Sequence, residues 1–318
     1  MKSYDLGAYG KLSLSKEFLR HGCYDGLPLQ FKQWLDAGND FASARDALPG
    51  HDERTRRWTF TSPGGAQVIV ACVVDSHDAS GTRRFPFAVF VTLARADLGL
   101  HGSTTRLEPL WGALETRLAE LRRCPSPDSF YEQIRGSVLQ GEPDSDSAVE
   151  ARAREFRTSP AATWVDRLYA QDAPDLWVRG LWRLRSWVRH FANAAPGPVL
   201  RAARVPVTGD ATSCAREVDL WIEVLRKLHP SFSALPTVWC APMAGRATTV
   251  DLVYRVPGAE DFAASLGGEF PDGSVCDLVR GKGKLPIDGF GDFRRRIESG
   301  PFQPGASVGA VLEFEIDR

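Results

Sequence analysis

The sequence has no excess of charge of one sign, no closely spaced cysteine pair and no long apolar run. Its 318 residues include 39 basic and 40 acidic side chains, so the composition predicts no binding of nucleic acid. The six cysteines occupy positions 23, 72, 124, 214, 240 and 276 without a CxxC pair, a spacing that supports neither a zinc site nor a redox motif. No run approaches 18 apolar residues, so no membrane insertion is predicted.

The start of the chain also lacks the features of a secreted protein. The stretch MKSYDLGAYGKLSL has neither an apolar h-region nor a cleavage site. We therefore expect a cytoplasmic protein with reduced thiols. Cys72, inside the apolar run QVIVACVV, is expected to pack as a small core side chain. With 43% hydrophobic and 25% charged residues, the composition is that of a globular protein with a substantial core.

Signatures of known enzyme classes are missing as well. The chain has no Walker A loop, no GxSxG elbow, no HExxH and no GxGxxG. GKGKLP at 281–286 lacks the Walker spacing, and we expect a surface turn there. In HGCYDG a catalytic pair of His21 and Cys23 is conceivable, but a flexible, glycine-flanked exit from a helix is the expectation. The residues by themselves therefore predict no metal, no cofactor and no reaction.

Hydrophobic periodicity predicts the elements of the first hundred residues. YDLGAYGKL is expected to be an edge strand or a strand broken near a close backbone approach. Phe31, Trp34 and Leu35 share one face of a helix predicted over 27–46. Three strands are predicted at 57–61, 66–75 and 85–93. The last has apolar residues at both alternating sets of positions, which predicts burial on both faces: Phe85, Phe87, Val89, Val91 and Leu93 in one set, Ala88 and Phe90 in the other.

The polar cluster between the last two of these strands has two interpretations. Asp75, Ser76, His77 and Asp78 contain the residue types of a hydrolytic site. However, catalytic triads are assembled from distant segments, and SHDASGTR is rich in turn-forming residues. We therefore expect a β-hairpin in which Asp78 or Ser76 accepts a hydrogen bond from its own downstream backbone. A hydrolase using residues 75–78 is the alternative.

The middle of the chain carries the clearest helix signal. Over about 107–123, the apolar stripe is formed by Leu107, Leu110, Trp111, Leu114, Leu118 and Leu121. Ser126 before Pro127 predicts the N-cap and first residue of a further helix. The polar stretch 140–156 is interpreted as a linker or a solvated helix. A tryptophan-rich helix is predicted over 175–191, with an apolar stripe of Trp177, Leu181, Leu184, Val188 and Phe191. Its arginines could bind nucleic acid, but a core-facing helix with a solvated basic side is favoured.

The last third has its own α/β pattern. A helix is expected over 214–228, strands at 237–241 and 249–256, a short helix at 259–267 and a final strand at 309–316. Helices combined with hairpin-connected strands indicate the α+β class, with an antiparallel or mixed sheet covered by helices and a second, smaller α/β part at the C-terminus. The predicted organisation is an N-terminal domain at 1–139, the charged segment at 140–156, and a helical segment with the C-terminal part at 157–318.

Several segments resemble the type VI secretion system-associated TagF/ImpM family. GAYGKL, EFLRHG and LPLQFKQWLDAG are similar to the family's N-terminal pattern, in which the matching positions are Gly7, Tyr9, Gly10, Lys11, Leu12, Phe18 and Trp34. Ser13 stands where the family usually has proline, and Ser15-Lys16-Glu17 stands in place of Arg-Gly-Asp.

Two further segments resemble the same family. A Ser-x-Asp-x-x-Gly-Arg-x-Phe-Pro pattern matches Ser76, Asp78, Gly81, Arg83, Phe85 and Pro86, with Thr82 as one inserted residue. LPTVWCAP followed by RVPGAEDFAASLGG is similar to a family strand with a Trp-Trp pair, a turn and a helix. There Trp239 fits and Cys240 replaces the second tryptophan. The three matches occur in the family's order within residues 5–268.

The resemblance implies a role in regulation by binding. Family members look like non-enzymatic, cytoplasmic accessory proteins that restrain type VI secretion after translation, acting on forkhead-associated scaffold proteins. The resemblance implies no catalytic residue and no cofactor for this chain. It also leaves open whether this chain represses or activates secretion. The expected partner surface comprises Tyr9, Lys11, Asp78, Gly81 and Arg83. Arg83 is available either for a partner carboxylate or for an ion pair with Asp75 or Asp78, and Tyr9 could equally be a core residue. An assembly adaptor of another secretion-like machine is a further alternative.

Overall fold

The computed structural model describes most of the chain. The described residues are 2–48, 52–61, 65–99, 103–141, 143–169, 178–186, 202–208, 211–228, 235–241, 248–270, 275–279, 289–300 and 306–313. Three predicted features lie wholly or partly outside them: the turn at 281–286, Trp177, Val188 and Phe191 of the tryptophan-rich helix, and Phe314 to Ile316 of the final strand.

The first half of the chain contains groups of strands separated by helices. Its elements are β1 (Lys2–Asp5), β2 (Gly7–Gly10), β3 (Leu19–His21), α1 (Gly26–Ser43), β4 (Arg56–Thr61), β5 (Gln67–Val74), β6 (Phe87–Ala94), the 3-10 helix η1 (Arg95–Leu98), α2 (Ser103–Arg106), α3 (Glu108–Arg122), α4 (Pro127–Ile134), β7 (Val138–Gly141) and α5 (Asp146–Thr158). The polar stretch 140–156 thus contains the end of β7, a short strand that we did not predict. It also contains most of α5, which agrees with the solvated helix that was one of the two interpretations of this stretch.

The second half contributes strands to the same sheet as the first. Its elements are α6 (Ala161–Tyr169), a helical stretch at 178–186, β8 (Ala202–Val207), α8 (Ala211–Leu228), β9 (Thr237–Ala241), β10 (Thr248–Val253), the 3-10 helix η4 (Ala259–Asp261), α9 (Phe262–Ser265), β11 (Val275–Asp277), α10 (Phe290–Ser299) and α11 (Val308–Glu313). None of the helices in the described ranges is long and apolar enough to cross a bilayer.

The sheet confirms the predicted α+β class. Nine strands lie in the order β11-β8-β10-β9-β4-β5-β6-β2-β3, and β1 pairs separately with β7. The pairs are antiparallel except β11 with β8, so the sheet is mixed. The pairing of β4 with β9 joins strands from the two halves of the chain. YDLGAYGKL is broken into β1 and β2, as one of the two predictions for it stated.

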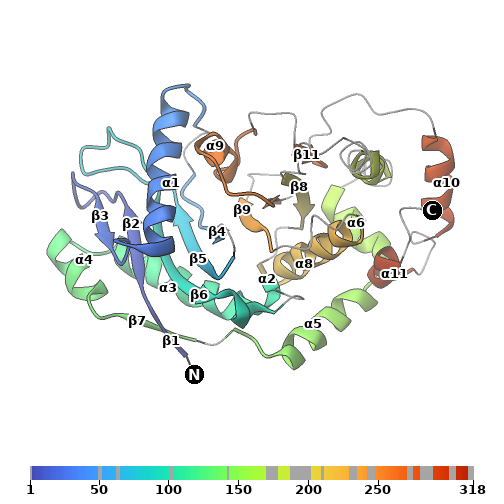
Figure 1. The fold of residues 1–318 in the computed structure, drawn as a ribbon, viewed down its shortest axis with the longest axis horizontal. Coiled ribbons are helices and arrows are strands. Elements are labelled where there is room, and N and C mark those ends of the chain that lie inside the picture. The colour runs from blue at the N-terminus through green and yellow to red at the C-terminus, as the bar shows by residue number, and fades with distance from the viewer. Residues whose placement is uncertain are drawn as a thin grey trace.

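Helices cover both faces of this sheet (Figure 1). Residues Val68, Val70, Cys72, Val89 and Val91 pack with α3 on one face. The intervening Ile69, Ala71, Val73, Ala88 and Phe90 pack with α1 on the other. The predicted burial of both faces is therefore confirmed for β6, and β5 is buried in the same way, because period-two alternation directs successive side chains to opposite sides.

One residue of the third predicted strand lies on the other face. Phe85 was expected to share a face with Phe87 and Val89, but it packs in the cluster on the α1 side. The reason is that β6 begins only at Phe87, so residue 85 belongs to the loop and is free of the strand's alternation. There its ring lies edge-on to Tyr9 and Phe18.

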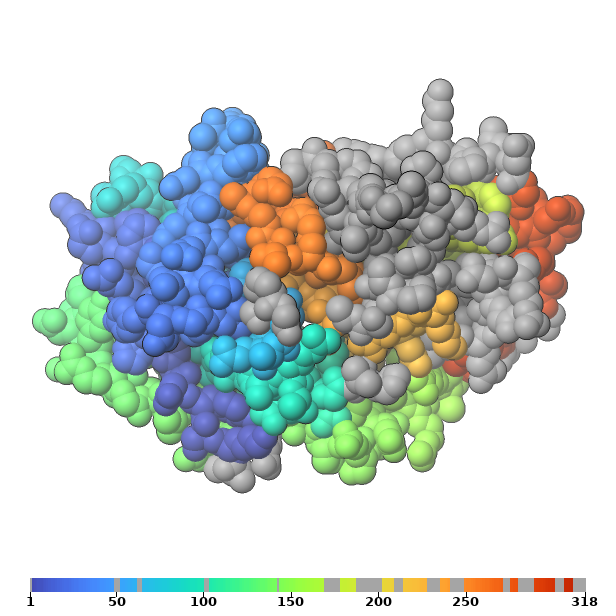
Figure 2. Space-filling view, in the orientation of Figure 1, coloured from blue at the N-terminus to red at the C-terminus, as the bar shows by residue number. Residues whose placement is uncertain are grey.

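A tryptophan stack connects α1 with the C-terminal half. The rings of Trp34 and Trp239 lie 5.4 Å apart and nearly parallel. The indole Nε1 of Trp34 also donates to the Gly258 carbonyl at 2.9 Å. Figure 2 shows the segment around residues 259–268 lying directly against α1. The first and third segments that resemble the TagF/ImpM family therefore meet in one core.

The predicted helices of the second half are confirmed where the structure describes them. On α8, Val218, Trp221 and Leu225 are buried in a cluster that also contains Leu181 and Leu184 of the helical stretch 178–186. That stretch is helical with buried leucines, as expected of a core-facing helix.

The final strand predicted at 309–316 is wrong in the described part. Residues 308–313 form α11, which contacts α5, α6 and α8. Just before it, Ala161 N–H donates to the Ala306 carbonyl and Val308 N–H to the Ser159 carbonyl. A short apolar run fits a strand and a buried helix equally well by periodicity, and here packing against three helices decided the outcome.

The N-cap of α4 gives a direct test of a local prediction. The Ser126 hydroxyl accepts from Ser129 N–H at 3.2 Å, and the Ser129 hydroxyl accepts from Ser126 N–H. Ser126→Ala is expected to lower the free energy of unfolding by about 1 kcal/mol, because an N–H of the first turn loses its acceptor. Urea unfolding followed by tryptophan fluorescence measures this. Thr116→Ala on the exposed face of α3 is the control, with an expected change within about 0.5 kcal/mol; equal effects of both variants would contradict the capping role.

Candidate functional site

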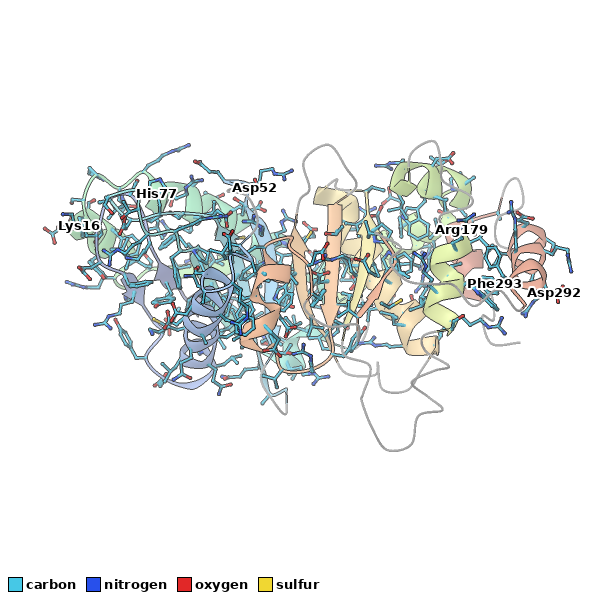
Figure 3. All side chains as sticks on the ribbon, turned by 90° about the horizontal axis from the view of Figure 1, so that it is seen from above. Lys16, Asp52, His77, Arg179, Asp292 and Phe293 are labelled. Atoms are coloured by element: carbon cyan, nitrogen blue, oxygen red, sulfur yellow. The ribbon has the colours of Figure 1, made fainter. Side chains whose placement is uncertain are left out.

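Two of the segments that carry the resemblance form one surface. The loop at 11–18, between β2 and β3, packs against the loop at 75–86, between β5 and β6. Ala79 N–H donates to the Ser15 carbonyl at 2.9 Å, and Arg83 Nη2 donates to the Lys16 carbonyl at 2.7 Å. In Figure 3, Lys16 and His77 lie at the same end of the molecule, far from Arg179 and Asp292.

Asp78 organises the longer loop from inside. Its side chain is fully buried and accepts hydrogen bonds from Ser80 N–H at 3.1 Å, the Ser80 hydroxyl at 2.6 Å and Arg83 Nε at 2.5 Å. The Ser80 hydroxyl and then Arg83 hold the pKa of Asp78 well below its usual range, although burial opposes this. The bond from Ser80 N–H is the predicted turn bond to the downstream backbone. Asp78 is thus an ionised anchor of the loop.

Gly81 closes the turn that Asp78 begins. Its N–H donates to the Asp78 carbonyl at 2.9 Å, and its φ of +71° lies in the left-handed region that favours glycine. The ladder of the hairpin continues into this loop, since Asp78 N–H donates to the Arg83 carbonyl and Phe85 N–H to the Ser76 carbonyl. The predicted hairpin is therefore confirmed.

Lys11 and Tyr9 lie beneath this surface rather than on it. Lys11 is 3% exposed; its Nζ donates to the Lys16 carbonyl at 3.0 Å and lies 3.9 Å from Asp78 and 4.3 Å from the centre of the Phe18 ring. Burial, followed by the charge of Arg83, lowers the pKa of Lys11. The Tyr9 ring stacks on Phe18, and its hydroxyl donates to Asp36. Burial and that bond raise the pKa of Tyr9. Both residues position the surface.

Arg83 is the member of the predicted set that carries charge to the surface. Its side chain is 56% exposed although Nε is bonded to Asp78. Asp75, the other expected partner, is bonded instead by Arg84 at 2.6 Å and Arg56 at 3.3 Å. Arg83 therefore forms an ion pair with Asp78 and still presents part of its guanidinium to solvent.

A pocket of about 750 Å³ opens beside Arg83, between the two loops and α1. The loops contribute Phe18, Thr82, Arg83 and Phe85, and α1 contributes Asp36, Asn39, Asp40 and Ser43. Sequence reasoning missed the α1 residues, although their spacing of three and four places them along one helix edge. Asn39 Oδ1 is buried there without a hydrogen-bond partner, so the pocket offers a polar acceptor as well as an aromatic wall.

The residues considered for catalysis make structural contacts. A His77 ring nitrogen lies 2.9 Å from the Asp78 carbonyl oxygen, while the Asp78 carboxylate binds Ser80 and Arg83. His21 ends β3 and Cys23 precedes α1, so this segment leads into a helix rather than out of one. Burial raises the pKa of the Cys23 thiol. Within the described ranges, no group of three or more His, Cys, Asp or Glu side chains is placed to hold a metal ion.

Comparison with known proteins assigns this region to a family. Residues 7–136 match the model of the TagF N-terminal domain, described as type VI secretion system-associated. The match contains both loops, α1 and all five residues of the predicted partner surface. No curated protein matches the sequence.

Solved structures are also similar over part of the chain. One of them is the crystal structure of PA0076 from Pseudomonas aeruginosa PAO1, with 20% sequence identity and a TM-score of 0.33. The similarity covers 43% of the present chain and 64% of PA0076, so the chain spans less than two thirds of that protein.

Proposed function

Because residues 7–136 belong to the TagF N-terminal domain family and mark the chain as type VI secretion-associated, we propose that it is a cytoplasmic accessory protein that regulates this system after translation. It acts by binding a protein partner at the surface formed by the loops at 11–18 and 75–86, without catalysis. A forkhead-associated scaffold protein, which the resemblance implies, is the first partner to test.

The observation that carries this proposal is the buried Asp78 anchor. A buried carboxylate requires partners that compensate its lost hydration, and here those partners fix the loop on which Arg83 lies. The same arrangement leaves Phe18 36% exposed, one of four large hydrophobic side chains exposed to that degree in the described part of the chain. Arginine and aromatic side chains are enriched at protein interfaces and among the residues that dominate binding energy. The two loops, which hydrogen-bond to each other and carry Phe18 and Arg83 beside a pocket, suit a partner's side chain.

Two substitutions test this surface. Phe18→Ala and Arg83→Ala are each expected to weaken capture of the partner at least about tenfold, because each removes an exposed contact group of a type that dominates interfaces. Arg83→Ala also removes the hydrogen bonds that Arg83 donates to the buried Asp78 carboxylate and to the Lys16 carbonyl, so the free energy of unfolding should fall as well, by about 1.5–3 kcal/mol. Phe18→Ala removes neither bond, so its effect on capture separates partner binding from loop stability. The measurement is affinity purification of the tagged full chain from cells that assemble a type VI system, with mass spectrometry and thermal melts of each variant.

The matched control is Arg117→Ala. Arg117 is a partly exposed arginine of α3, on the opposite face of the sheet, and pairs with Glu120. The Arg117→Ala variant should capture the partner as well as the unmodified chain does. If Phe18→Ala and Arg83→Ala also retain the partner, the proposed surface is wrong. Capture of components of another secretion machine would instead favour an assembly adaptor.

A further inference from the structure

Two cysteines outside the TagF-like domain meet in the core between α8 and the sheet. Cys240 lies on β9, where alternation sends Val238 and Cys240 to the side of α8 and Trp239 to the side of α1. Cys214 lies on α8 in line with the buried Val218 and Trp221. Because both thiols point into the same cluster, their sulfur atoms come within 3.4 Å of each other.

This distance is a non-bonded contact. A disulfide has an S–S length of about 2.05 Å, so from 3.4 Å the two sulfurs need to approach by about 1.3 Å for the bond to form. All six cysteines are free thiols in the structure. Cys72 and Cys124 point to backbone carbonyl oxygens instead, those of Trp111 and Glu120.

We propose that Cys214 and Cys240 are an oxidative modification site, at which a peroxide or a disulfide oxidant converts the two thiols reversibly into a disulfide that joins α8 to β9. The sequence pattern does not indicate this pair, because 25 residues separate Cys214 from Cys240 and no CxxC motif is present. The resemblance to the TagF/ImpM family assigns no role to the two cysteines either.

The two sulfurs have different roles in the reaction. The neighbouring Cys240 sulfur, followed by burial, raises the pKa of the Cys214 thiol well above its usual range, so Cys214 stays protonated. Cys240 is partly exposed whereas Cys214 is buried, so Cys240 is the sulfur that an oxidant reaches first. Cys240 attacks hydrogen peroxide, the O–O bond breaks, and a sulfenic acid and one water form. The Cys214 sulfur then attacks the sulfenic sulfur, the S–O bond breaks, and the hydroxyl leaves with the Cys214 proton as a second water. Two thiols are oxidised and one peroxide is reduced.

The disulfide would fasten a helix to the middle of the sheet. β9 pairs with β10 on one side and β4 on the other, and α8 covers the same cluster. Figure 1 shows α8 beside β9 in this part of the molecule. Cross-linking these residues restricts the unfolded chain more than the folded one. The oxidised protein should therefore melt several degrees higher than the reduced protein.

The experiment uses the reduced full-length chain. It is treated with hydrogen peroxide under native conditions, the excess is removed, and remaining thiols are alkylated in denaturant before intact-mass measurement. We expect the intact mass to show four alkylated cysteines and a loss of two hydrogens. The non-reducing peptide map should contain a disulfide-linked Cys214–Cys240 peptide. Treatment with dithiothreitol should restore six alkylated cysteines. Any of three results would overturn the proposal. The first is six alkylated cysteines after oxidation, and the second is a disulfide to any other cysteine. The third is oxidation of Cys240 beyond the sulfenic acid without formation of the disulfide.

Variants separate this bond from general oxidation. Cys240→Ala should retain five alkylated cysteines and show no rise in melting temperature on treatment. Cys276→Ala, which removes a buried thiol of β11, should still form the bond and leave three. If either variant fails to fold, the mass measurement on the unmodified chain is sufficient to show whether the Cys214–Cys240 disulfide forms.

Discussion

Replacing Asp251 with alanine is expected to lower the free energy of unfolding by about 3–5 kcal/mol. Asp251 and Arg204 are register partners on β10 and β8. Their side chains form two parallel hydrogen bonds of 2.7 Å, and each side chain is 2% exposed. Removing the carboxylate leaves a guanidinium buried without its counter-charge, and this uncompensated charge is the source of the loss.

Arg204 also holds the turn that follows α9. Its Nη1 donates to the Gly268 carbonyl at 2.8 Å and its Nη2 lies 3.4 Å from the Ala264 carbonyl. The guanidinium stands over the ring of Phe270. In Asp251→Ala we therefore expect this turn to loosen, and backbone amides of residues 264–268 to exchange hydrogen faster than in the unmodified chain.

Two controls make the Asp251 test specific. The double variant Arg204→Met with Asp251→Leu should recover most of the lost stability, because a well-packed apolar pair can replace a buried ion pair. Glu298→Ala removes the exposed Arg294–Glu298 pair of α10 and should cost no more than about 0.5 kcal/mol. Urea unfolding measures all three. A loss below about 1 kcal/mol for Asp251→Ala would show that Arg204 finds another partner or water.

The second large effect is a pH dependence caused by Glu217. This residue of α8 is fully buried and accepts from Thr208 N–H at 2.6 Å and from the Thr208 hydroxyl at 2.8 Å. Burial raises the pKa of Glu217 from its usual 4.5 to about 7, although the Thr208 bonds and the charge of Arg167 oppose the rise. The carboxyl group is therefore neutral in the folded chain over a pH range in which it is ionised in the unfolded chain.

The sign of the effect follows from proton binding. Between about pH 4.5 and 7 the folded chain holds a proton that the unfolded chain releases, so the free energy of unfolding falls as the pH rises. The contribution is fully present below this window and lost above it. Its size is on the order of 3 kcal/mol, since one pKa unit corresponds to about 1.4 kcal/mol.

Glu217→Gln isolates this contribution from those of other titrating groups. Glutamine keeps an acceptor for Thr208 and cannot ionise, so the stability of the variant relative to the unmodified chain should rise by about 3 kcal/mol from pH 4.5 to 7.5. Glu223→Gln is the control: Glu223 is a partly exposed residue of the same helix that pairs with Arg157. Urea unfolding at a series of pH values gives both differences. A difference for Glu217→Gln that does not change with pH would contradict the assignment.

The sequence by itself determined the elements whose signals are local. The apolar stripe of α3, the Ser126 cap and the two-sided burial of β6 each depend on residues within a few positions of one another. The turn at Asp78 belongs with them, because the hydrogen bond from Ser80 N–H to the Asp78 carboxylate joins residues only two positions apart.

The tertiary structure decided what depends on residues distant in the chain. It selected Asp78 rather than Asp75 as the partner of Arg83, placed α1 residues such as Asn39 beside the loops, made α11 a helix and brought Cys214 to Cys240. The physical reason is the range of the forces involved. Hydrogen bonding along the chain and side-chain periodicity act over a few residues, whereas ion pairs, pockets and thiol contacts require segments that only packing of the whole core brings together.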